Sequence, residues 1–241
     1  MRIIAVALSA LLLSGCAALE PAPDYRNVIV SPDRTDADRT IDQRREPQKL
    51  LEFYGVRPGM RVLDMSAGRG YNAELLARVV GPNGRVYAQS SPALMFPATK
   101  AAMEERLKTP IMKNVTYTVR DFEDPAPPEA RNLDLVTFNF NYHDTVWLKT
   151  DRARMNRAVF AALKPGGIYI VADHSAKSGA GDVSKSLHRI EESVVRQEVL
   201  AAGFRLVESG DFLRNPDDPR ELPVSKNTVR NDEFVLKFRK P

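Results

Sequence analysis

The segment from Arg61 to Tyr71 has the residue types of a ligand-binding turn. An apolar run predicts a strand that ends at the acidic Asp64, and a helix is expected to begin near Tyr71. Between them lie small residues that let backbone N–H groups approach a ligand, namely Ser66, Ala67, Gly68 and Gly70. A side chain at either glycine would fill the space of the ligand, and the positive end of the helix dipole would point to the same place. The alternative is an ordinary strand-to-helix turn that needs glycine for its backbone angles.

A second group of polar residues follows two further expected strands. It comprises Asn139, Asn141, Tyr142, His143 and Asp144, and then Asp173 and His174. Open α/β sheets bind ligands outside the carboxyl ends of their strands, so these side chains are candidates for catalysis. A histidine titrates near neutrality and suits a general base. Alternatively, His143 bonds within its own loop and Asp173 caps the following segment. His143, Asp144, Asp173 and His174 are acceptable metal ligands, but their spacing is unspecific and no metal site is predicted.

Helical and extended patterns alternate along the chain. Strands are expected at 61–65, 85–89, 115–119, 133–140, 168–172, 204–208 and 233–238. Helices are expected at 38–54, in two pieces with Pro47 opening the second, and at 72–80, 92–107, 151–163 and 188–202. Strands separated by helices imply a parallel sheet, whereas the last two strands have no helix pattern between them. The expected fold class is α/β, a Rossmann-like doubly wound, mostly parallel seven-stranded sheet with an antiparallel last strand.

The first residues have the pattern of an export signal. Met1-Arg2 is positively charged, and the run from Ile3 to Leu13 is apolar apart from Ser9. This run is too short to span a bilayer, which needs ~20 helical residues, and it predicts a signal peptide over 1–15. A buried apolar helix that ends in a chance cysteine is the alternative.

Leu13-Ser14-Gly15-Cys16 resembles a bacterial lipobox, which would make Cys16 the lipidated mature N-terminus. By the same resemblance, Ala17 after the cysteine indicates the periplasmic face of the outer membrane. Residues 17–37, rich in Pro and Asp, are expected to form a tether and entry arm. The remaining residues, 38–241, suffice for one domain with a full core.

The composition argues against two classes of partner and site. The chain of 241 residues has 35 Lys and Arg against 31 Asp and Glu, closely interspersed, for a net charge of +4. It has no basic stripe and little aromatic interleaving, so no nucleic-acid partner is predicted. Cys16 is the only cysteine, which excludes intrachain disulfides and sites made of several thiolates.

The order of the expected elements, the turn from Asp64 to Gly70, and the run Leu163-Lys164-Pro165-Gly166-Gly167 resemble a class I S-adenosylmethionine-dependent methyltransferase. The resemblance extends from about Asp36 to the C-terminus. In the segments 31–34, 141–144 and 234–241 the chain is similar to a little-characterised group of predicted bacterial methyltransferases.

The resemblance implies S-adenosylmethionine as cofactor, with contacts from Asp64, Ser66, Gly68, Gly70, Ser90, Asp121, Phe122 and Asn139. The methionine end would lie against the glycine turn, and Asp64 would orient that turn or the cofactor's amino group. Asp121 would bond the adenine amine, with Phe122 beside the ring; a turn-forming Asp121 is the alternative. If the two strands are neighbours as in the family, His143 and His174 lie near each other and near the methyl group.

Two positions depart from the family pattern. Ser66 stands where the first turn glycine is usual. At the end of the second strand, Gln89-Ser90-Ser91 replaces the acid that accepts both ribose hydroxyls. Gln89 or Ser90 would still hydrogen-bond a ribose, but without the charge assistance that strengthens such a bond.

The sequence therefore predicts a methyltransferase that acts on an unidentified small or envelope-associated acceptor, with His143, His174 and Asp173 as catalytic residues. The alternative is a non-catalytic periplasmic ligand-binding or interaction module on the same fold, because S-adenosylmethionine is made in the cytosol and the ribose acid is missing. A nicotinamide-dependent oxidoreductase is less favoured. Gly68, Gly70 and Ala73 match its looser Gly-x-Gly-x-x-Ala pattern, but its ribose acid is missing too.

Overall fold

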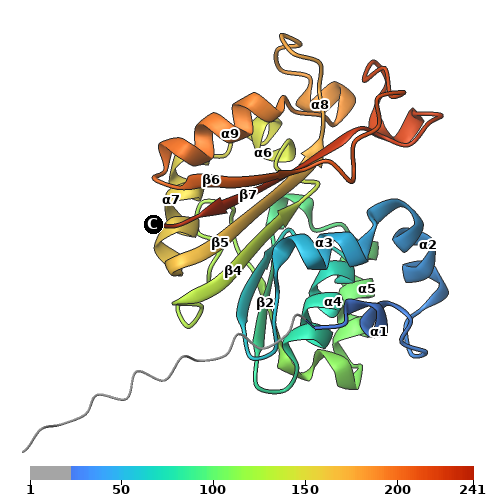
Figure 1. Cartoon of the computed structure of the whole chain (residues 1–241), viewed down its shortest axis with the longest axis vertical. Helices are drawn as coiled ribbons and strands as arrows, with labels where there is room; N and C mark the ends of the chain where they lie inside the picture. Colours follow the sequence, from blue (N-terminus) through green and yellow to red (C-terminus); the bar gives the residue numbers. More distant parts are fainter. Residues whose placement is uncertain (1–22) are drawn as a thin grey trace, which may run out of the picture.

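The computed structural model describes residues 23–241, so the predicted signal peptide and Cys16 lie outside the described residues. A seven-stranded sheet has the order β3-β2-β1-β4-β5-β7-β6 (Figure 1). Its strands are β1 (Arg61–Met65), β2 (Arg85–Ser90), β3 (Val115–Val119), β4 (Leu133–Asn139), β5 (Leu163–His174), β6 (Arg205–Gly210) and β7 (Glu233–Arg239). The strands from β3 to β5 pair in parallel, and β7 is antiparallel to β5 and β6. The predicted fold class is confirmed.

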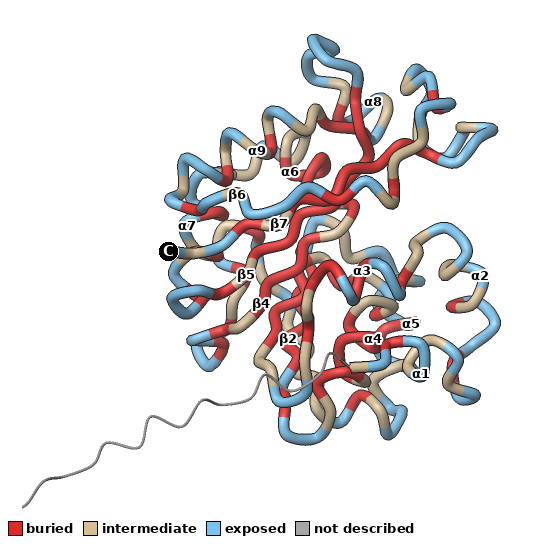
Figure 2. The backbone as a smooth tube through the Cα atoms, in the orientation of Figure 1, coloured by how far each residue is buried: buried red, intermediate tan, exposed pale blue. Residues whose placement is uncertain are grey.

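Helices cover both faces of the sheet. The described helices are α1 (Tyr25–Ile29), α2 (Asp36–Arg45), α3 (Pro47–Tyr54), α4 (Tyr71–Val80), α5 (Pro97–Leu107), α6 (Asp144–Trp147), α7 (Arg152–Ala162), α8 (Ser184–Leu187) and α9 (Glu192–Ala201). Val62 of β1 packs into the core under α3, α4 and α5, whereas its neighbour Leu63 packs into the core under α7 and α9. This alternation is what a strand covered on both faces requires, and buried residues run through the centre of the sheet in Figure 2.

The largest differences from the predicted element boundaries are in three places. The helix expected at 92–107 is interrupted, because Pro97 opens a new helix after the short 3-10 turn Pro92–Leu94. Strand β5 begins at Leu163 and includes the Pro-Gly-Gly loop, where Gly166 N–H donates to the Lys240 carbonyl at 2.9 Å. The helix expected from His188 begins at Glu192, and His188 instead ends α8 in a left-handed conformation.

The described part of the expected entry arm, 23–37, is folded against the domain. The Tyr25 hydroxyl is buried and donates to the Val56 carbonyl at 2.7 Å. Arg34 donates to both carboxylate oxygens of Asp42 in α2. α1 contacts α3 and α4, and Tyr71 of α4 donates to Asp42 of α2 at 2.6 Å, so this segment is packed on the domain rather than extended as a tether. Within residues 23–241, none of the helices is both long and apolar enough to cross a membrane.

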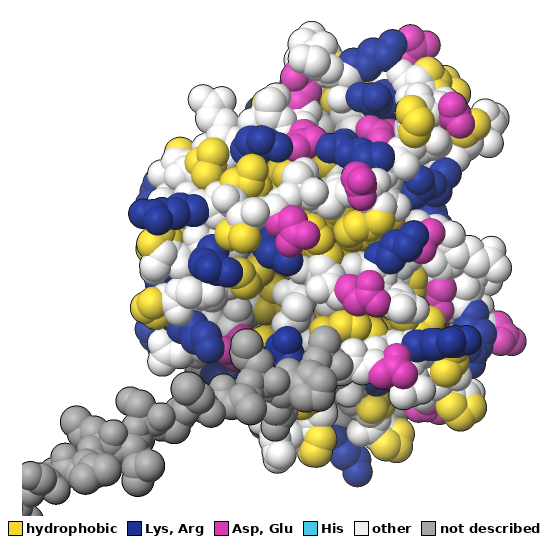
Figure 3. Space-filling view, in the orientation of Figure 1, with side chains coloured by type: hydrophobic (Ala, Val, Ile, Leu, Met, Phe, Trp, Pro, Cys, Tyr) yellow, Lys and Arg dark blue, Asp and Glu magenta, His cyan; other side chains and the backbone are white. Residues whose placement is uncertain are grey.

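The carboxyl ends of the central strands lie between two groups of segments. In Figure 1 the α8 region and the loop before β7 lie above this edge, and α2 and α5 lie below it. Figure 3 shows the outline of the molecule indented between these two groups. The residues predicted to do chemistry lie at this edge, as expected for an open α/β sheet.

Candidate active site

The turn after β1 holds Ser66 in a glycine-like conformation. Its φ of 55° lies in the left-handed region, which costs a non-glycine residue about 1–2 kcal/mol. Two hydrogen bonds offset this cost: Ser66 N–H donates to Gln89 Oε1, and Ser66 Oγ donates to Asn141 Oδ1, both at 3.0 Å. Serine is therefore tolerated where the family has glycine.

The two glycines of the turn serve different purposes. A Cβ on Gly70 would lie 2.8 Å from Arg106 Cδ and 3.1 Å from Met103 Sδ, so Gly70 is needed for packing against α5. A Cβ on Gly68 would meet only the Ser66 carbonyl, at 3.9 Å, and Gly68 lines an open cavity. The space that a Cβ on Gly70 would enter is thus filled by α5, and Gly70 as a cofactor contact stays a prediction.

Asp64 is buried at the end of β1 and ties three elements together. Its Oδ1 accepts from Asn72 of α4 at 2.7 Å and from Thr137 of β4 at 2.8 Å. Its Oδ2 is buried without a hydrogen-bond partner. Burial raises the pKa of Asp64 to about 6, against the opposing effect of the two hydrogen bonds. The turn from Ser66 to Gly70 is the predicted cofactor turn. An unpartnered carboxylate oxygen beside it could accept a hydrogen bond from the ammonium group of a ligand.

The end of β2 does not present Gln89 to a ligand. Gln89 is fully buried and its side chain bridges Ser66 N–H and the Arg120 carbonyl. Ser90 Oγ is buried and has no hydrogen-bond partner. Gln89 thus uses its side-chain amide within the fold, whereas the Ser90 hydroxyl is left without a partner and stays the candidate for a ribose bond.

A cavity of about 540 Å³ lies beside the end of β3, where adenine was expected. Asp121, Phe122 and Ser91 are among its lining residues. Asp121 is exposed, but Phe122 is 2% exposed and its ring packs against Phe138 with centroids 5.3 Å apart. Phe122 is thus a residue of the hydrophobic core, and its predicted contact with an adenine ring stays a prediction.

A second cavity, of about 480 Å³, brings the predicted cofactor turn together with His143 and His174, two of the three predicted catalytic residues. Ser66 and Gly68 line one part of it, and His143 and His174 line another. Leu94, Phe96, Phe140 and Trp147 supply apolar surface. A cofactor held by the turn and an acceptor beside the histidines would share one space.

His143 is fixed by the buried Asp173. Asp173 Oδ1 lies 2.8 Å from His143 Nδ1, and Oδ2 accepts from the His143 backbone N–H at 2.7 Å. Burial acts to lower the pKa of His143, but the Asp173 charge and hydrogen bond outweigh it and raise that pKa. With Nδ1 bonded to Asp173, Nε2 is the ring atom left for chemistry.

His174 lies next to His143 and faces a second acid. The two imidazole centroids are 5.9 Å apart, as the strand-neighbour argument predicted. His174 Nδ1 and Glu233 Oε1 are 2.9 Å apart but are not aligned for a hydrogen bond. Glu233 was missed because it belongs to β7, the far end of the chain, and only the antiparallel pairing His174↔Glu233 brings it here.

The third histidine completes this group. His188 forms an edge-to-face pair with His143, with centroids 5.5 Å apart, and lines the same cavity. Sequence reasoning gave it no role, and its one signal was that the chain has only three histidines.

Arg45, the last residue of α2, lies over the Phe140 ring at the end of β4. Its guanidinium lies 3.5 Å from the Phe140 ring centroid, and its Nε is buried without a hydrogen-bond partner. Burial and the nearby Arg44 lower the pKa of Arg45 to about 10. Asn139, a predicted cofactor contact, donates to the Tyr54 hydroxyl at 2.8 Å and leaves its Oδ1 unpartnered. Both side chains thus have polar atoms free for a ligand at the end of β4.

Residues 62–167 match the protein family described as a methyltransferase domain. Over these residues the chain is similar to methyltransferases. This match supports the sequence-based resemblance to methyltransferases. The match begins in β1 and ends at Gly167, so it includes both the glycine turn and the Pro-Gly-Gly loop.

The curated relatives that match this chain are named for different reactions. A ubiquinone/menaquinone biosynthesis C-methyltransferase of Proteus mirabilis is 32% identical over 126 residues, which are 52% of this chain and 47% of the relative. A protein-L-isoaspartate O-methyltransferase of Ignicoccus hospitalis is 30% identical over 135 residues, which are 56% of this chain and 57% of the relative. The chain spans about half the length of the curated relatives it matches.

Solved structures support the fold of the domain over most of the chain. A SAM dependent methyltransferase from Aquifex aeolicus aligns with a TM-score of 0.61 at 18% identity, covering 86% of this chain and 100% of that one. The [4+2]-cyclase SpnF aligns with a TM-score of 0.59 at 18% identity, covering 85% of this chain and 82% of that one. One fold thus hosts proteins named for different reactions, so the reaction must be argued from the site.

Proposed function

We propose that this protein transfers a methyl group from S-adenosylmethionine to a small or envelope-associated acceptor bound beside His143 and His174. The observation that carries the proposal is the shared cavity, which is lined by Gly68 of the cofactor turn and by both histidines. The methyltransferase relatives support the reaction class. They do not agree on the acceptor, since one is named a C-methyltransferase and the other an O-methyltransferase.

The cofactor supplies a sulfonium-bound methyl group, which is reactive enough that alignment and exclusion of water provide much of the rate. Gly68 leaves space for it, and the buried Oδ2 of Asp64 is suited to accept from its ammonium group. The unpartnered Ser90 hydroxyl is the candidate for a ribose bond. Without an acid at this position, we expect weaker cofactor binding than a ribose carboxylate would give.

On the acceptor side of the cavity, Asp173 and Phe140 orient the two histidines, and the histidines can hold a proton. Asp173 fixes the His143 ring, and Phe140 packs against His174 with centroids 5.3 Å apart. Either imidazole can take the proton of an acceptor hydroxyl, amine or thiol within this partly apolar cavity.

The lipid anchor at Cys16 and the periplasmic face of the outer membrane belong to the same proposal. They rest on the pattern from Leu13 to Cys16 alone. An anchored enzyme would meet acceptors of the envelope, but it would also need an exported supply of cofactor.

Calorimetric titration of the full chain with S-adenosylmethionine and S-adenosylhomocysteine tests the proposal. We expect micromolar binding that Gly68→Val abolishes, because a valine side chain would enter the cavity. Gly179→Val is the matched control: Gly179 has a φ of 74°, also has open space around it, and lies in the loop after β5 away from the cofactor turn. The same backbone strain should there leave binding unchanged. A folded protein that binds neither compound would refute the proposal and favour the non-catalytic binding module.

A further inference from the structure

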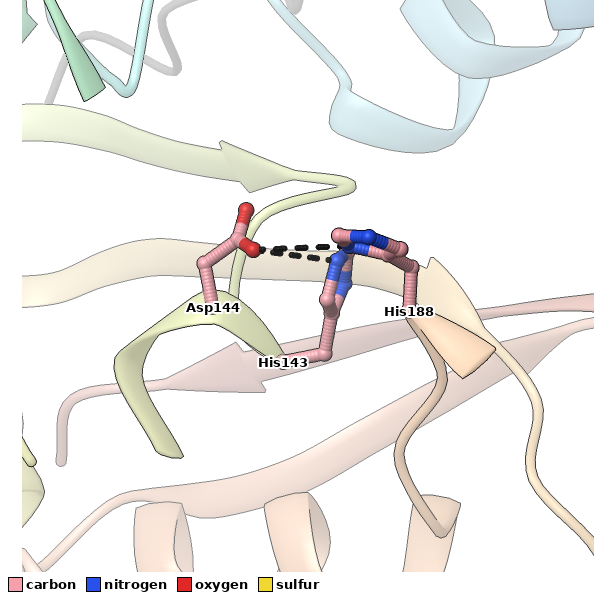
Figure 4. A group of neighbouring side chains, drawn as sticks. All are labelled: His143, Asp144 and His188. Atoms are coloured by element: carbon pink, nitrogen blue, oxygen red, sulfur yellow. Dashed lines mark ion pairs between the residues drawn. The ribbon is translucent and has the colours of Figure 1, made fainter. Parts of the chain in front are cut away.

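We infer that His143, Asp144 and His188 form a binding site for a divalent transition-metal ion of the zinc type, open to the acceptor cavity. Their ligand atoms, one from each side chain, all lie within 4.8 Å of one another. Figure 4 shows the two imidazoles turned toward the Asp144 carboxylate. Two histidines and one carboxylate are ligands that Zn²⁺ commonly takes. Ion binding itself does not depend on the proposed methyl transfer; only the use made of the ion does.

The ring nitrogens of His143 and His188 lie too far from Asp144 Oδ1 for strong hydrogen bonds, but at distances that suit ligands of one shared ion. Asp144 Oδ1 is 3.4 Å from His143 Nε2 and 3.8 Å from His188 Nδ1. Tetrahedral bonds of 2.0–2.1 Å put ligand atoms about 3.3 Å apart, so His143 and Asp144 already have the required spacing, and His188 would have to move closer to both to complete the site. Among the described residues the His188 ring has no hydrogen-bond partner, although it lies next to a buried acid.

The neighbours of the cluster orient its ligands as metal sites require. Asp173 holds His143 Nδ1, which aims Nε2 toward Asp144. Asp144 is held by Asn141, which donates to Oδ2 at 2.6 Å, and by Trp147, which donates to Oδ1 at 2.8 Å. Histidine ligands bonded to a carboxylate and carboxylate ligands bonded to donors are the usual outer arrangement of metal sites. Oδ1 keeps a second lone pair for an ion.

The arrangement would leave coordination positions open on the cavity side. His143 and Asp144 have buried side chains, whereas that of His188 is 48% exposed, and all three line the cavity that includes Ser66 and Gly68. Three protein ligands with an open position are typical of catalytic rather than structural zinc. An acceptor hydroxyl or thiol bound there would lose its proton more readily. His174, which is outside the ligand set, would remain to take that proton.

The test uses the tag-free full chain, freed of metal with a chelator and then titrated with Zn²⁺ against a chelating dye. We expect one Zn²⁺ per chain, and His188→Ala should weaken binding by more than about 100-fold, beyond the effect of losing an outer partner. Because His188 is partly exposed, this variant should fold. Trp147→Phe removes a donor to Asp144 and should weaken binding about 10-fold. His174→Gln, which keeps all three ligands, should bind Zn²⁺ like the unaltered chain.

Co²⁺ in place of Zn²⁺ gives a second readout, since its visible absorption depends on the coordination geometry. The absorption should appear at one equivalent and be lost in His188→Ala. Absence of stoichiometric binding, or equal Zn²⁺ affinity in His188→Ala and the unaltered chain, would overturn the inference. The outcome is separable from that of the proposed function, because cofactor titration is read by calorimetry on the metal-free chain.

Discussion

Asp64 has one carboxylate oxygen bonded within the fold and the other unpartnered at the cofactor turn. The bonded oxygen joins α4 and β4 to the end of β1. The unpartnered one adds nothing to the fold, and burial raises the pKa of the group to about 6. A buried polar atom that weakens the folded state is expected where a ligand uses it.

Asp64→Asn should therefore separate binding from stability. The amide oxygen can still accept from Asn72 and Thr137, but the charge is lost, so the affinity for S-adenosylmethionine should fall roughly 10- to 100-fold. The folded state keeps the Asp64 proton up to a pH of about 6, whereas the unfolded chain releases it near the ordinary aspartate pKa of 3.8. The unaltered protein should thus lose on the order of 3 kcal/mol relative to the variant as pH rises from 4 to 7.

Calorimetry measures the affinity, and urea unfolding of both proteins at several pH values measures the stability difference. A variant that binds the cofactor with unchanged affinity would show that Asp64 serves only the fold.

The sequence placed His143 and His174 together because the carboxyl ends of neighbouring parallel strands meet at one edge. The same reasoning could not find His188 or Glu233. His188 follows α8 in a long excursion after β5, and its position depends on loop packing that has no sequence period. Glu233 was recognised as the start of a strand, but its partner depends on where β7 inserts in the sheet.

At the scale of elements, Arg106 of α5 links two other helices and the cofactor turn. It pairs with Asp38 of α2 at 2.8 Å and with Glu74 of α4, and it donates to the Arg69 carbonyl at 2.9 Å. Both acids are almost buried, so their charges are screened little by solvent. Arg106 thereby holds α2 and α4 next to the turn after β1, in which Gly70 packs against α5.

Arg106→Met should destabilise the protein by about 3 kcal/mol, because it leaves the buried Asp38 carboxylate without its cation, whereas Glu74 keeps its pair with Arg78. The matched control is Lys108→Met: Lys108 follows α5 and pairs with Glu105 in solvent, so its loss should cost less than about 0.5 kcal/mol. Urea unfolding at neutral pH compares the two. Equal effects of both substitutions would contradict the assigned role of Arg106.

The strands were the most predictable elements. β1 and β3 have the predicted bounds because short apolar runs are limited by turn residues on both sides. The extension of β5 through Pro165 and Gly166 was not predictable from propensity, since it depends on hydrogen bonds with Lys240, the residue after β7.

At the scale of the whole molecule, the N-terminal segment connects the domain to the predicted anchor. The chain is folded from residue 23 onward, with α1 against α3 and α4, and six residues, 17–22, lie between Cys16 and that point, a path of seven Cα–Cα steps. Fully extended, they would span about 25 Å. If Cys16 is lipidated, the domain would stay close to the membrane surface, within reach of envelope acceptors.

Cys16→Ser should release the protein from the membrane, because the lipid would lose its attachment atom. Labelling of bacteria that express the chain with a radioactive fatty acid, followed by separation of membrane and soluble fractions, measures this. The unaltered chain should carry label and sediment with membranes, whereas the variant should do neither. A C-terminal alkaline phosphatase fusion, active only after export, tests the side of the membrane. Deletion of residues 2–15 should abolish its activity, and a fusion that stays inactive with the full chain would make the enzyme cytosolic and remove the difficulty of cofactor supply.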